Sequence, residues 1–352
     1  MKQTLKFMID LKQLKQNYDT ACALVSPTKI APVLKNNAYG LGLLKIGSEL
    51  YQQARCENFF IDYVPEAIQL RGVAPGANIY ILQGFSQKDL SKIKGYNLIP
   101  VISSLEDFKL WKNSGITYIK PVLQVDTGLN RLGFREEDLR QLTNEDKKIF
   151  GMCMSHLACA DLPNHPLNKK QLLTMKGVQK SLGGIPLTLS ASSGIYLGRE
   201  YHCDMLRLGN ALFGLKHRIC KDFKPVVSIS APVLQIAHVK KGENVGYKGI
   251  YNADSDKKIA VLGIGFGDGL FRSLASCMPV FFGQEPAPII GSICMDCTIV
   301  DVSHINQIEK YEEASVIGQN YTLDEMAAAV GTLPTEVLSH LGNSRRFQHV
   351  YI

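Results

Sequence analysis

A lysine at the end of an apolar run is the residue of this chain best suited to chemistry. The stretch from Ile30 to Gly42 reads IAPVLKNNAYGLG, in which a strand-like segment ends at Lys35 and is followed by polar residues, Tyr39 and glycines. Such a change is typical of a strand that leads into an active-site loop. An ammonium group at the end of a buried strand loses part of its hydration, which makes its amine a usable nucleophile or base. Lys35 could therefore form a Schiff base, although most lysines in such positions only reach solvent.

The elements that must position Lys35 recur along the first part of the chain. Eight short apolar runs alternate with amphipathic or charged segments: 30–34, 59–64, 78–82, 98–102, 118–125, 150–156, 187–191 and 205–208. Apolar runs that are each followed by a helix-length segment indicate parallel strands buried on both faces, and eight of them predict a (β/α)8 TIM-type barrel. A doubly wound open sheet is the alternative, but no glycine-rich turn after the first run supplies a dinucleotide site.

The composition changes after about Lys224, where valine, isoleucine and glycine turns replace helix formers. The fold class is therefore α/β, with an amino-terminal barrel and a carboxyl-terminal, mainly β domain. We expect residues 1–225 to form the barrel and residues 226–352 the second domain, with a strand within residues 1–11 packing against the second domain. Helix-start signals accompany this division: Ser103 with Glu106, the proline and acid at 65–66, and a capping box at Thr322 and Glu325.

Composition excludes several classes of function. The formal net charge of +7 is spread over helix-like segments and forms no arginine-rich stripe, which disfavours nucleic-acid binding. The nine cysteines form no zinc-ligand pattern, so we expect no metal and read them as reduced thiols in a cytoplasmic protein. No signal peptide or membrane span is apparent.

Polar residues also follow the other predicted strands, and in such a barrel these ends meet at the ligand site. The candidates are Lys35, Tyr39, Arg131, His156, Ser193, Arg207, Gly209 and Asn210. The Tyr39 and Ser193 hydroxyls, together with the backbone amides of Gly209 and Asn210, could form a phosphate site. A lysine nucleophile beside a phosphate site suggests pyridoxal phosphate. Taken singly, His156 could be only a satisfied histidine near a strand end, and Arg207 only a partner of Asp204 or Glu200.

Seven segments together resemble the motifs of bacterial alanine racemases, which are pyridoxal-phosphate enzymes of fold type III. They are LKNNAYGLG, VDTGLNRLGF, SHLACAD, RLGNALFGL, VGYKGIY, GFGDG and SICMDCTIVDV, in this order over nearly the whole chain. The resemblance implies a barrel that binds pyridoxal 5'-phosphate and a β domain that supplies a second catalytic base. It also implies interconversion of L- and D-alanine for peptidoglycan.

The resemblance assigns the two catalytic bases. Lys35 would hold the cofactor and act as one base, and Tyr247 would act as the other, with Gly246 in place of the family's serine. Racemisation removes the α-proton from one face and returns it to the other, so bases on opposite faces suit it. In the family the tyrosine comes from the partner subunit, which implies a homodimer with shared active sites.

The remaining roles follow from the same resemblance. Arg207 would bond the pyridine nitrogen and His156 would bridge Arg207 and Tyr247, while Arg131 and Met295 would contact the amino-acid substrate. A tyrosine is a poor base at neutral pH unless its neighbours stabilise the phenolate. A guanidinium is not expected to give up its proton, so the ring nitrogen would stay unprotonated, which suppresses transamination.

Three positions depart from the family pattern. Gln124 stands where the family often has a carbamylated lysine, so another group must orient Arg131, such as a bound chloride or the amide itself. Phe266 replaces a tyrosine. Thr335 replaces a tyrosine that contacts phosphate and narrows the pocket, so we expect serine to be turned over more readily than in relatives.

Two other functional classes are open at this point. A fold type III decarboxylase of a basic amino acid would need an acidic pocket and a catalytic cysteine in the β domain, and the VGYKG segment favours the racemase instead. A non-enzymatic, cofactor-carrying barrel would lack a second domain.

Overall fold

The structure is a computed structural model that describes residues 5–215, 220–310 and 312–352. It divides into two compact units. One contains residues 14–38 and 42–224, and the other contains residues 5–13, 39–41 and 225–352. Within the described ranges, no helix is both long and apolar enough to cross a membrane.

The first unit is a closed barrel of parallel strands. Its eight-stranded sheet has the order β2-β9-β8-β7-β6-β5-β4-β3, and a parallel bridge between Val33 and Phe60 joins the two end strands. The strands are β2 (Lys29–Pro32), β3 (Asn58–Ile61), β4 (Asn78–Ile81), β5 (Ile99–Ile102), β6 (Val122–Gln124), β7 (Met152–Met154), β8 (Leu187–Ala191) and β9 (Met205–Leu208). The predicted barrel is therefore confirmed.

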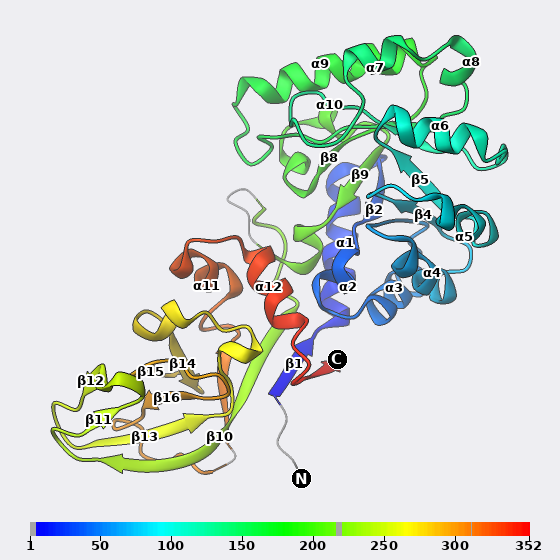
Figure 1. The fold of residues 1–352 in the computed structure, drawn as a ribbon. Helices are drawn as coiled ribbons and strands as arrows, with labels where there is room; N and C mark the ends of the chain where they lie inside the picture. The colour runs from blue at the N-terminus through cyan, green and yellow to red at the C-terminus, as the bar shows by residue number, and fades with distance from the viewer. Residues whose placement is uncertain (1–4, 216–219, 311) are drawn as a thin grey trace. The chain divides into compact units, whose positions relative to one another are not determined.

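One helix precedes the first barrel strand and others follow the strands along the chain, and these helices lie outside the barrel (Figure 1). They are α1 (Leu11–Val25), α3 (Leu43–Gln52), α4 (Val64–Val73), α5 (Leu90–Gly95), α6 (Leu105–Asn113), α7 (Glu136–Arg140), α8 (Asn144–Lys147), α9 (Pro166–Ser181) and α10 (Arg199–His202). Apolar side chains fill the barrel interior, where the Phe60 and Tyr80 rings stack with centroids 4.6 Å apart. The barrel is thus a packed core, and its chemistry must lie at one end.

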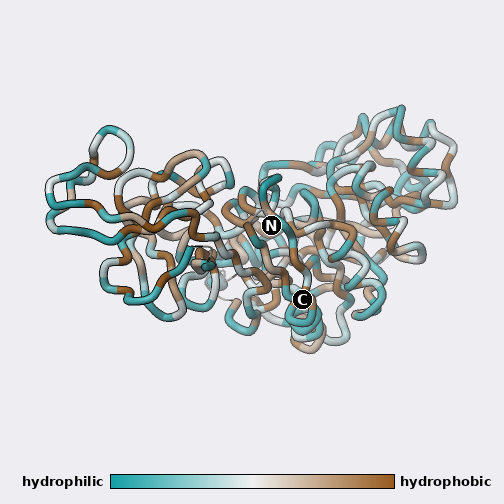
Figure 2. Tube along the Cα trace, turned by 90° about the horizontal axis from the view of Figure 1, so that it is seen from below, coloured by the Kyte–Doolittle hydropathy of each residue, from teal (hydrophilic) through white to brown (hydrophobic). Residues whose placement is uncertain are grey.

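The second unit is mainly β, as predicted. Its strands are β1 (Leu5–Ile9), β10 (Val227–Val239), β11 (Asn244–Val245), β12 (Tyr251–Asn252), β13 (Lys257–Leu262), β14 (Pro279–Phe282), β15 (Glu285–Pro288), β16 (Thr298–Asp301), β17 (Glu313–Ile317) and β18 (Phe347–Tyr351). The amino-terminal β1 pairs antiparallel with β10 and parallel with β18. Two helices follow β17, namely α11 (Leu323–Val330) and α12 (Pro334–Gly342). Figure 2 shows hydrophobic stretches alternating with hydrophilic ones along the chain.

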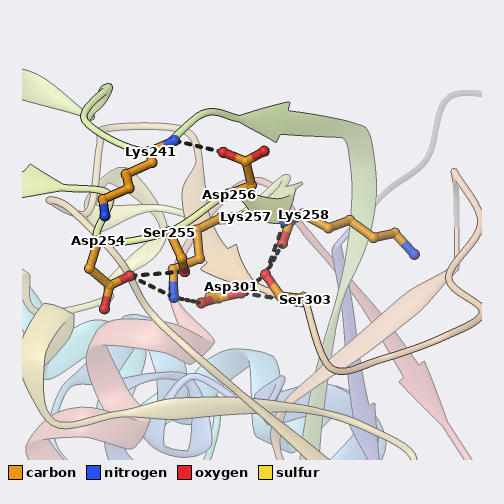
Figure 3. A network of polar contacts seen from close by, with 8 residues as sticks. All are labelled: Lys241, Asp254, Ser255, Asp256, Lys257, Lys258, Asp301 and Ser303. Carbon is orange, nitrogen blue, oxygen red and sulfur yellow. Dashed lines mark hydrogen bonds and ion pairs between the residues drawn. The ribbon is translucent and has the colours of Figure 1, made fainter.

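A network of charged side chains lies beside β13 and β16 in the β unit (Figure 3). The Lys257 ammonium lies 3.1 Å from an Asp254 oxygen and 3.2 Å from an Asp301 oxygen. Asp301 also accepts hydrogen bonds from the Ser303 backbone and hydroxyl, at 2.9 and 2.6 Å. Hydrogen bonding to Asp254 and then to Asp301 raises the pKa of Lys257, so this cation is fully paired.

Several local predictions need correction. The run from Tyr118 yields only the three residues of β6, because Tyr118 itself is 62% exposed in a loop. Val64 begins α4 instead of ending a strand. The cap of α6 is Ser104, whose hydroxyl accepts from the Asp107 amide, one residue beyond the predicted Ser103. The capping box at Thr322 and Glu325 forms as expected. Of the range 1–11, within which the amino-terminal strand is predicted, residues 1–4 lie outside the described residues.

Candidate active site

Lys35 begins a left-handed turn at the end of the first barrel strand. Asn36, Asn37 and Ala38 have φ of 53 to 55°, and Tyr39 has φ of 58°. Left-handed backbone costs non-glycine residues about 1–2 kcal/mol each, although asparagine tolerates it better than most. A strained turn of this kind is a common mark of a functional site. Tyr39 ends the turn with a buried side chain and belongs to the other compact unit.

Hydrogen bonds hold the strained turn in place. The Asn37 amide donates to Glu66 on α4 at 2.7 Å, and the Asn37 side-chain oxygen accepts from the Leu43 amide at 2.9 Å. The Gly42 amide donates to the Asn37 carbonyl at 3.0 Å. Within the described residues, the Lys35 amine itself forms no hydrogen bond or ion pair. The fold therefore fixes the backbone of Lys35 and leaves its amine available.

Arg207 lies on β9, the strand next to β2, and is buried with 4% exposure. One terminal nitrogen donates to the Thr188 hydroxyl at 2.7 Å, and the other donates to the Ser155 and Leu189 carbonyls at 2.6 and 3.0 Å. Among the described residues it pairs with no carboxylate, so it is not merely a partner of Asp204. Burial lowers the pKa of Arg207 to about 10, which still leaves the guanidinium charged at neutral pH.

His156 follows β7 and meets Arg207. Its Nδ1 lies 3.1 Å from the same Arg207 nitrogen that bonds Ser155. Because the guanidinium can only donate, Nδ1 accepts and the proton of a neutral ring sits on Nε2. Burial lowers the pKa of His156 to about 3, and the charges of Arg207, Arg131 and Lys35 act in the same direction. His156 is therefore neutral at physiological pH and has an Nε2 proton to donate.

The predicted phosphate residues lie at the ends of β8 and β9. Of the two serines after β8, Ser192 is the one that binds the backbone after β9. Its hydroxyl accepts hydrogen bonds from the Gly209 and Ala211 amides at 3.1 and 3.2 Å. Ser193 is next in the chain and forms a hydrogen bond with Cys220. Burial raises the pKa of the Cys220 thiol to about 11, and the hydrogen bond with Ser193 opposes this rise. Asn210 begins the following helical turn. The Gly209 amide thus donates to Ser192 within the protein, while Ser193 and Asn210 remain the predicted phosphate contacts.

Arg131 lies in the loop after β6 and is exposed. Gln124 does not bond it directly. The Gln124 amide donates to the Leu132 carbonyl at 3.1 Å and accepts from the Ser103 hydroxyl at 3.1 Å. Gln124 therefore holds the backbone next to Arg131 but supplies no charge to it.

The β unit carries the other predicted residues on its surface. Tyr247 is 69% exposed on the short turn between β11 and β12, where Gly246 has φ of 76°. Met295 is 58% exposed. Its neighbour Asp296 pairs with Arg346 at 3.0 Å. Thr335 lies on the first turn of α12, and Phe266 is 38% exposed.

Sequence reasoning missed two residues of this region. Asp62 follows β3 and is 8% exposed, and a polar residue directly after an apolar run could have indicated it. Gln171 on α9 is fully buried, donates to the Thr127 hydroxyl at 3.1 Å and the His156 carbonyl at 2.9 Å, and so ties two loops together. No pattern in the sequence distinguishes Gln171 from a surface glutamine of a helix.

The residues present fit pyridoxal phosphate. An unpaired amine on Lys35 suits the aldehyde. Among the described residues no atom accepts a hydrogen bond from Nε of the buried Arg207, so this N–H group suits an unprotonated ring nitrogen. The serine hydroxyls that follow β8 suit the phosphate.

Comparisons with known proteins agree with this fit. Residues 9–217 match the family described as alanine racemase, N-terminal domain, and residues 226–351 match the alanine racemase, C-terminal domain. Alanine racemase of Brucella abortus is 33% identical, with 98% of this chain and 92% of that protein covered. A catabolic alanine racemase of Agrobacterium fabrum is 34% identical, with 98% and 91% covered.

A solved structure gives the same result. Alanine racemase from Bartonella henselae, with covalently bound pyridoxal phosphate, has a TM-score of 0.92 and 32% identity over 99% of this chain and all of that one. The barrel, its lysine and the joined β domain define a pyridoxal-phosphate enzyme of fold type III. The chain belongs to the alanine racemase family.

Proposed function

We propose that this protein interconverts L- and D-alanine, with pyridoxal phosphate bound to Lys35 and a second base on Tyr247. The observation that carries this proposal is the convergence of Lys35, His156 and Arg207 at one end of the barrel. Arg207 contacts His156, the charges of Arg207 and Lys35 both lower the pKa of His156, and the strand that leads to Lys35 pairs with the strand of Arg207. Family membership supplies the reaction class.

Two bases divide the proton transfer. When bound, pyridoxal phosphate stabilises the negative charge that develops at the α-carbon of the amino acid. The Lys35 amine exchanges a proton with that carbon on one face, and the Tyr247 phenol exchanges one on the other face. Each base therefore starts the reaction in one direction and ends it in the other.

Arg207 and His156 set the electrostatics of this exchange. Because Arg207 keeps its proton, it would donate a hydrogen bond to the ring nitrogen of the cofactor without making that nitrogen cationic, which would limit charge delocalisation into the ring. We propose that the Nε2 proton of His156 bonds the Tyr247 oxygen and stabilises its phenolate. The bond from Arg207 to Nδ1 fixes the His156 tautomer that this requires.

A homodimer would complete the site. A catalytic phenol that is 69% exposed on its own chain needs a cover that excludes water. We propose that Tyr247 acts in the site of the partner subunit, with the exposed Met295 beside the substrate. The cofactor would be held by Lys35 and Ser193 of the barrel and by Tyr39.

The remaining proposals concern substrate and setting. Arg131 would bind the substrate carboxylate, and the small Thr335 would allow serine as well as alanine. All nine cysteines are free thiols, which suits a reducing, cytoplasmic setting where D-alanine is made for peptidoglycan.

The test is a chirality assay with the purified, cofactor-loaded protein. L-alanine, L-serine and L-lysine are supplied separately and the D-enantiomer is measured by chiral chromatography, with carbon dioxide release followed in parallel. We expect D-alanine to form fastest, D-serine more slowly and no carbon dioxide. Decarboxylation without racemisation would overturn the proposal.

A further inference from the structure

Asp62 is a buried carboxylate beside Lys35, and the proposed reaction assigns it no role. It directly follows β3, and the Leu34 amide donates to the Phe60 carbonyl of that strand at 2.9 Å. Lys35 and Asp62 therefore leave neighbouring parallel strands at the same end of the barrel. On the other side, the Gln83 amide donates to the Asp62 carbonyl at 3.1 Å. The backbone of Asp62 is thus fixed at the carboxyl edge of the sheet.

The Asp62 side chain is held by a short hydrogen-bonded chain. The Gln83 side-chain amide donates to Asp62 Oδ2 at 3.3 Å, and the Tyr63 hydroxyl donates to the Gln83 oxygen at 3.0 Å. Within the described residues no cation lies within ion-pair distance of Asp62. The negative charge of Asp62 is therefore not neutralised by a single ion-pair partner, and it acts on the site as a whole.

Cations act on Asp62 and on its surroundings. Burial raises the pKa of Asp62, and the charge of Lys35, the hydrogen bond from Gln83 and the charge of Arg131 oppose that rise. Arg207 adds a third cation, as its influence together with Lys35 and Arg131 on His156 shows. Such a cluster attracts any small carboxylate.

The other polar groups of this region are bonded to backbone or neutral groups. Gln124 is neutral and its amide is already bonded to Leu132 and Ser103. Asp126 Oδ1 accepts hydrogen bonds from the backbone amides of Gly128, Leu129 and Asn130. Glu66 accepts from the backbone of the Lys35 turn.

We propose that Asp62 is a positioning and specificity residue that offsets the charge of Lys35 and Arg131, so that the site selects zwitterionic amino acids over simple carboxylates. An amino acid brings an ammonium group that a carboxylate attracts, whereas a plain carboxylate brings only negative charge that Asp62 repels. This inference rests on the proposed function, because it concerns the same site.

The test compares the binding of propionate, which is alanine without its amine, by calorimetry to loaded wild type, Asp62→Asn and Asp62→Glu at pH 8. Asp62→Asn keeps the shape and removes the charge, so we expect propionate to bind about three- to tenfold more tightly. Turnover of L-alanine should fall about tenfold in kcat/KM, and Asp62→Glu, which keeps the charge, should stay close to wild type in both measurements.

Unchanged or weaker propionate binding by folded Asp62→Asn contradicts the proposal. Should that variant fail to fold, Asp62→Ser removes the same charge with a smaller side chain and should likewise tighten propionate binding about threefold or more, with no change as the contradicting result. Because propionate binding needs no turnover, a wild type that binds propionate but does not racemise alanine refutes the proposed function separately.

Discussion

The cations at the mouth of the barrel differ from those of the β unit, although elsewhere in the barrel unit cations are also paired, such as Lys112 with Asp146 at 2.7 Å. In the β unit, Lys257 contacts two carboxylates, and Arg346 contacts Asp268 and Asp296 at 2.9 and 3.0 Å. At the mouth of the barrel, neither Lys35 nor Arg207 forms an ion pair with any described residue. The paired cations hold turns and strands of the β unit together. Lys35 makes no such contact, and Arg207 bonds only neutral groups of the barrel.

This difference shows which charges serve structure and which serve chemistry. Unpaired cations that face one another destabilise a folded chain, so their presence in one place is best explained by an anionic ligand. A paired cation is neutralised by a carboxylate of the protein, so removing the cation disturbs the fold locally. Equivalent substitutions in the two units should therefore separate loss of activity from loss of stability.

The largest effect is expected for Lys35→Ala. Because this amine both holds the cofactor and transfers a proton, its loss should abolish the visible absorption of the bound cofactor and lower kcat by about 10⁴-fold or more. The matched control is Lys257→Met, which should slightly lower the melting temperature and leave kcat unchanged. Racemisation by Lys35→Ala at a tenth of the wild-type rate would contradict the role of this lysine.

A smaller loss is expected for Arg207→Lys. A lysine cannot bond Thr188, Ser155 and His156 together and can pass a proton to the ring nitrogen. We expect kcat/KM for alanine to fall about 100-fold, or about 2.7 kcal/mol, and the slow release of pyruvate to rise. Arg346→Lys should lower the melting temperature without pyruvate release. Equal pyruvate release from both variants would remove the distinction.

His156 should make stability depend on pH. In the folded chain the pKa of His156 is lowered to about 3, so below the ordinary value of about 6.5 only the unfolded chain takes up this proton. This contribution is present above pH 6.5 and is lost as the pH falls, by at most about 1.4 kcal/mol per pH unit. Urea unfolding at pH 7 and pH 5 should show a smaller decrease for His156→Gln than for wild type. The exposed His238→Gln should behave as wild type does.

The smallest effect concerns substrate range. Replacing Thr335 by tyrosine fills space beside the predicted pocket, so the ratio of serine to alanine turnover should fall by about threefold to tenfold. Parallel kcat/KM measurements on both amino acids give the ratio. An unchanged ratio would show that Thr335 does not set the substrate range.

The barrel could be predicted because its signal is repeated. Each strand is a short apolar run followed by a helix, and residues such as Lys35 and Arg207 stand directly after or within those runs. Errors fell at strand ends, since apolarity continues into loops, as at Tyr118, or into helices, as at Val64. Apolarity measures burial and does not report where backbone pairing stops.

The finer chemistry of the site could not be predicted because it depends on contacts between distant segments. The sequence does not distinguish the adjacent residues Ser192 and Ser193, yet in the structure the Ser192 hydroxyl accepts a hydrogen bond from the Gly209 amide. Asp62 resembles any polar residue after a strand until its neighbours Lys35 and Arg131 are known. The role of Gln124 likewise required its partner Leu132.

The central claim, that one chain supplies the amine and another the phenol of each active site, is tested most directly with mixed dimers. Lys35→Ala and Tyr247→Phe chains with different affinity tags are expressed together and the mixed dimer is isolated through both tags. One of its two sites then contains both wild-type bases, so the account predicts about half of the wild-type activity from two nearly inactive parents. A mixed dimer of wild type with Lys35→Ala/Tyr247→Phe has no complete site and should show little activity. Recovery in this control and none in the first mixed dimer would show that both bases come from the same chain.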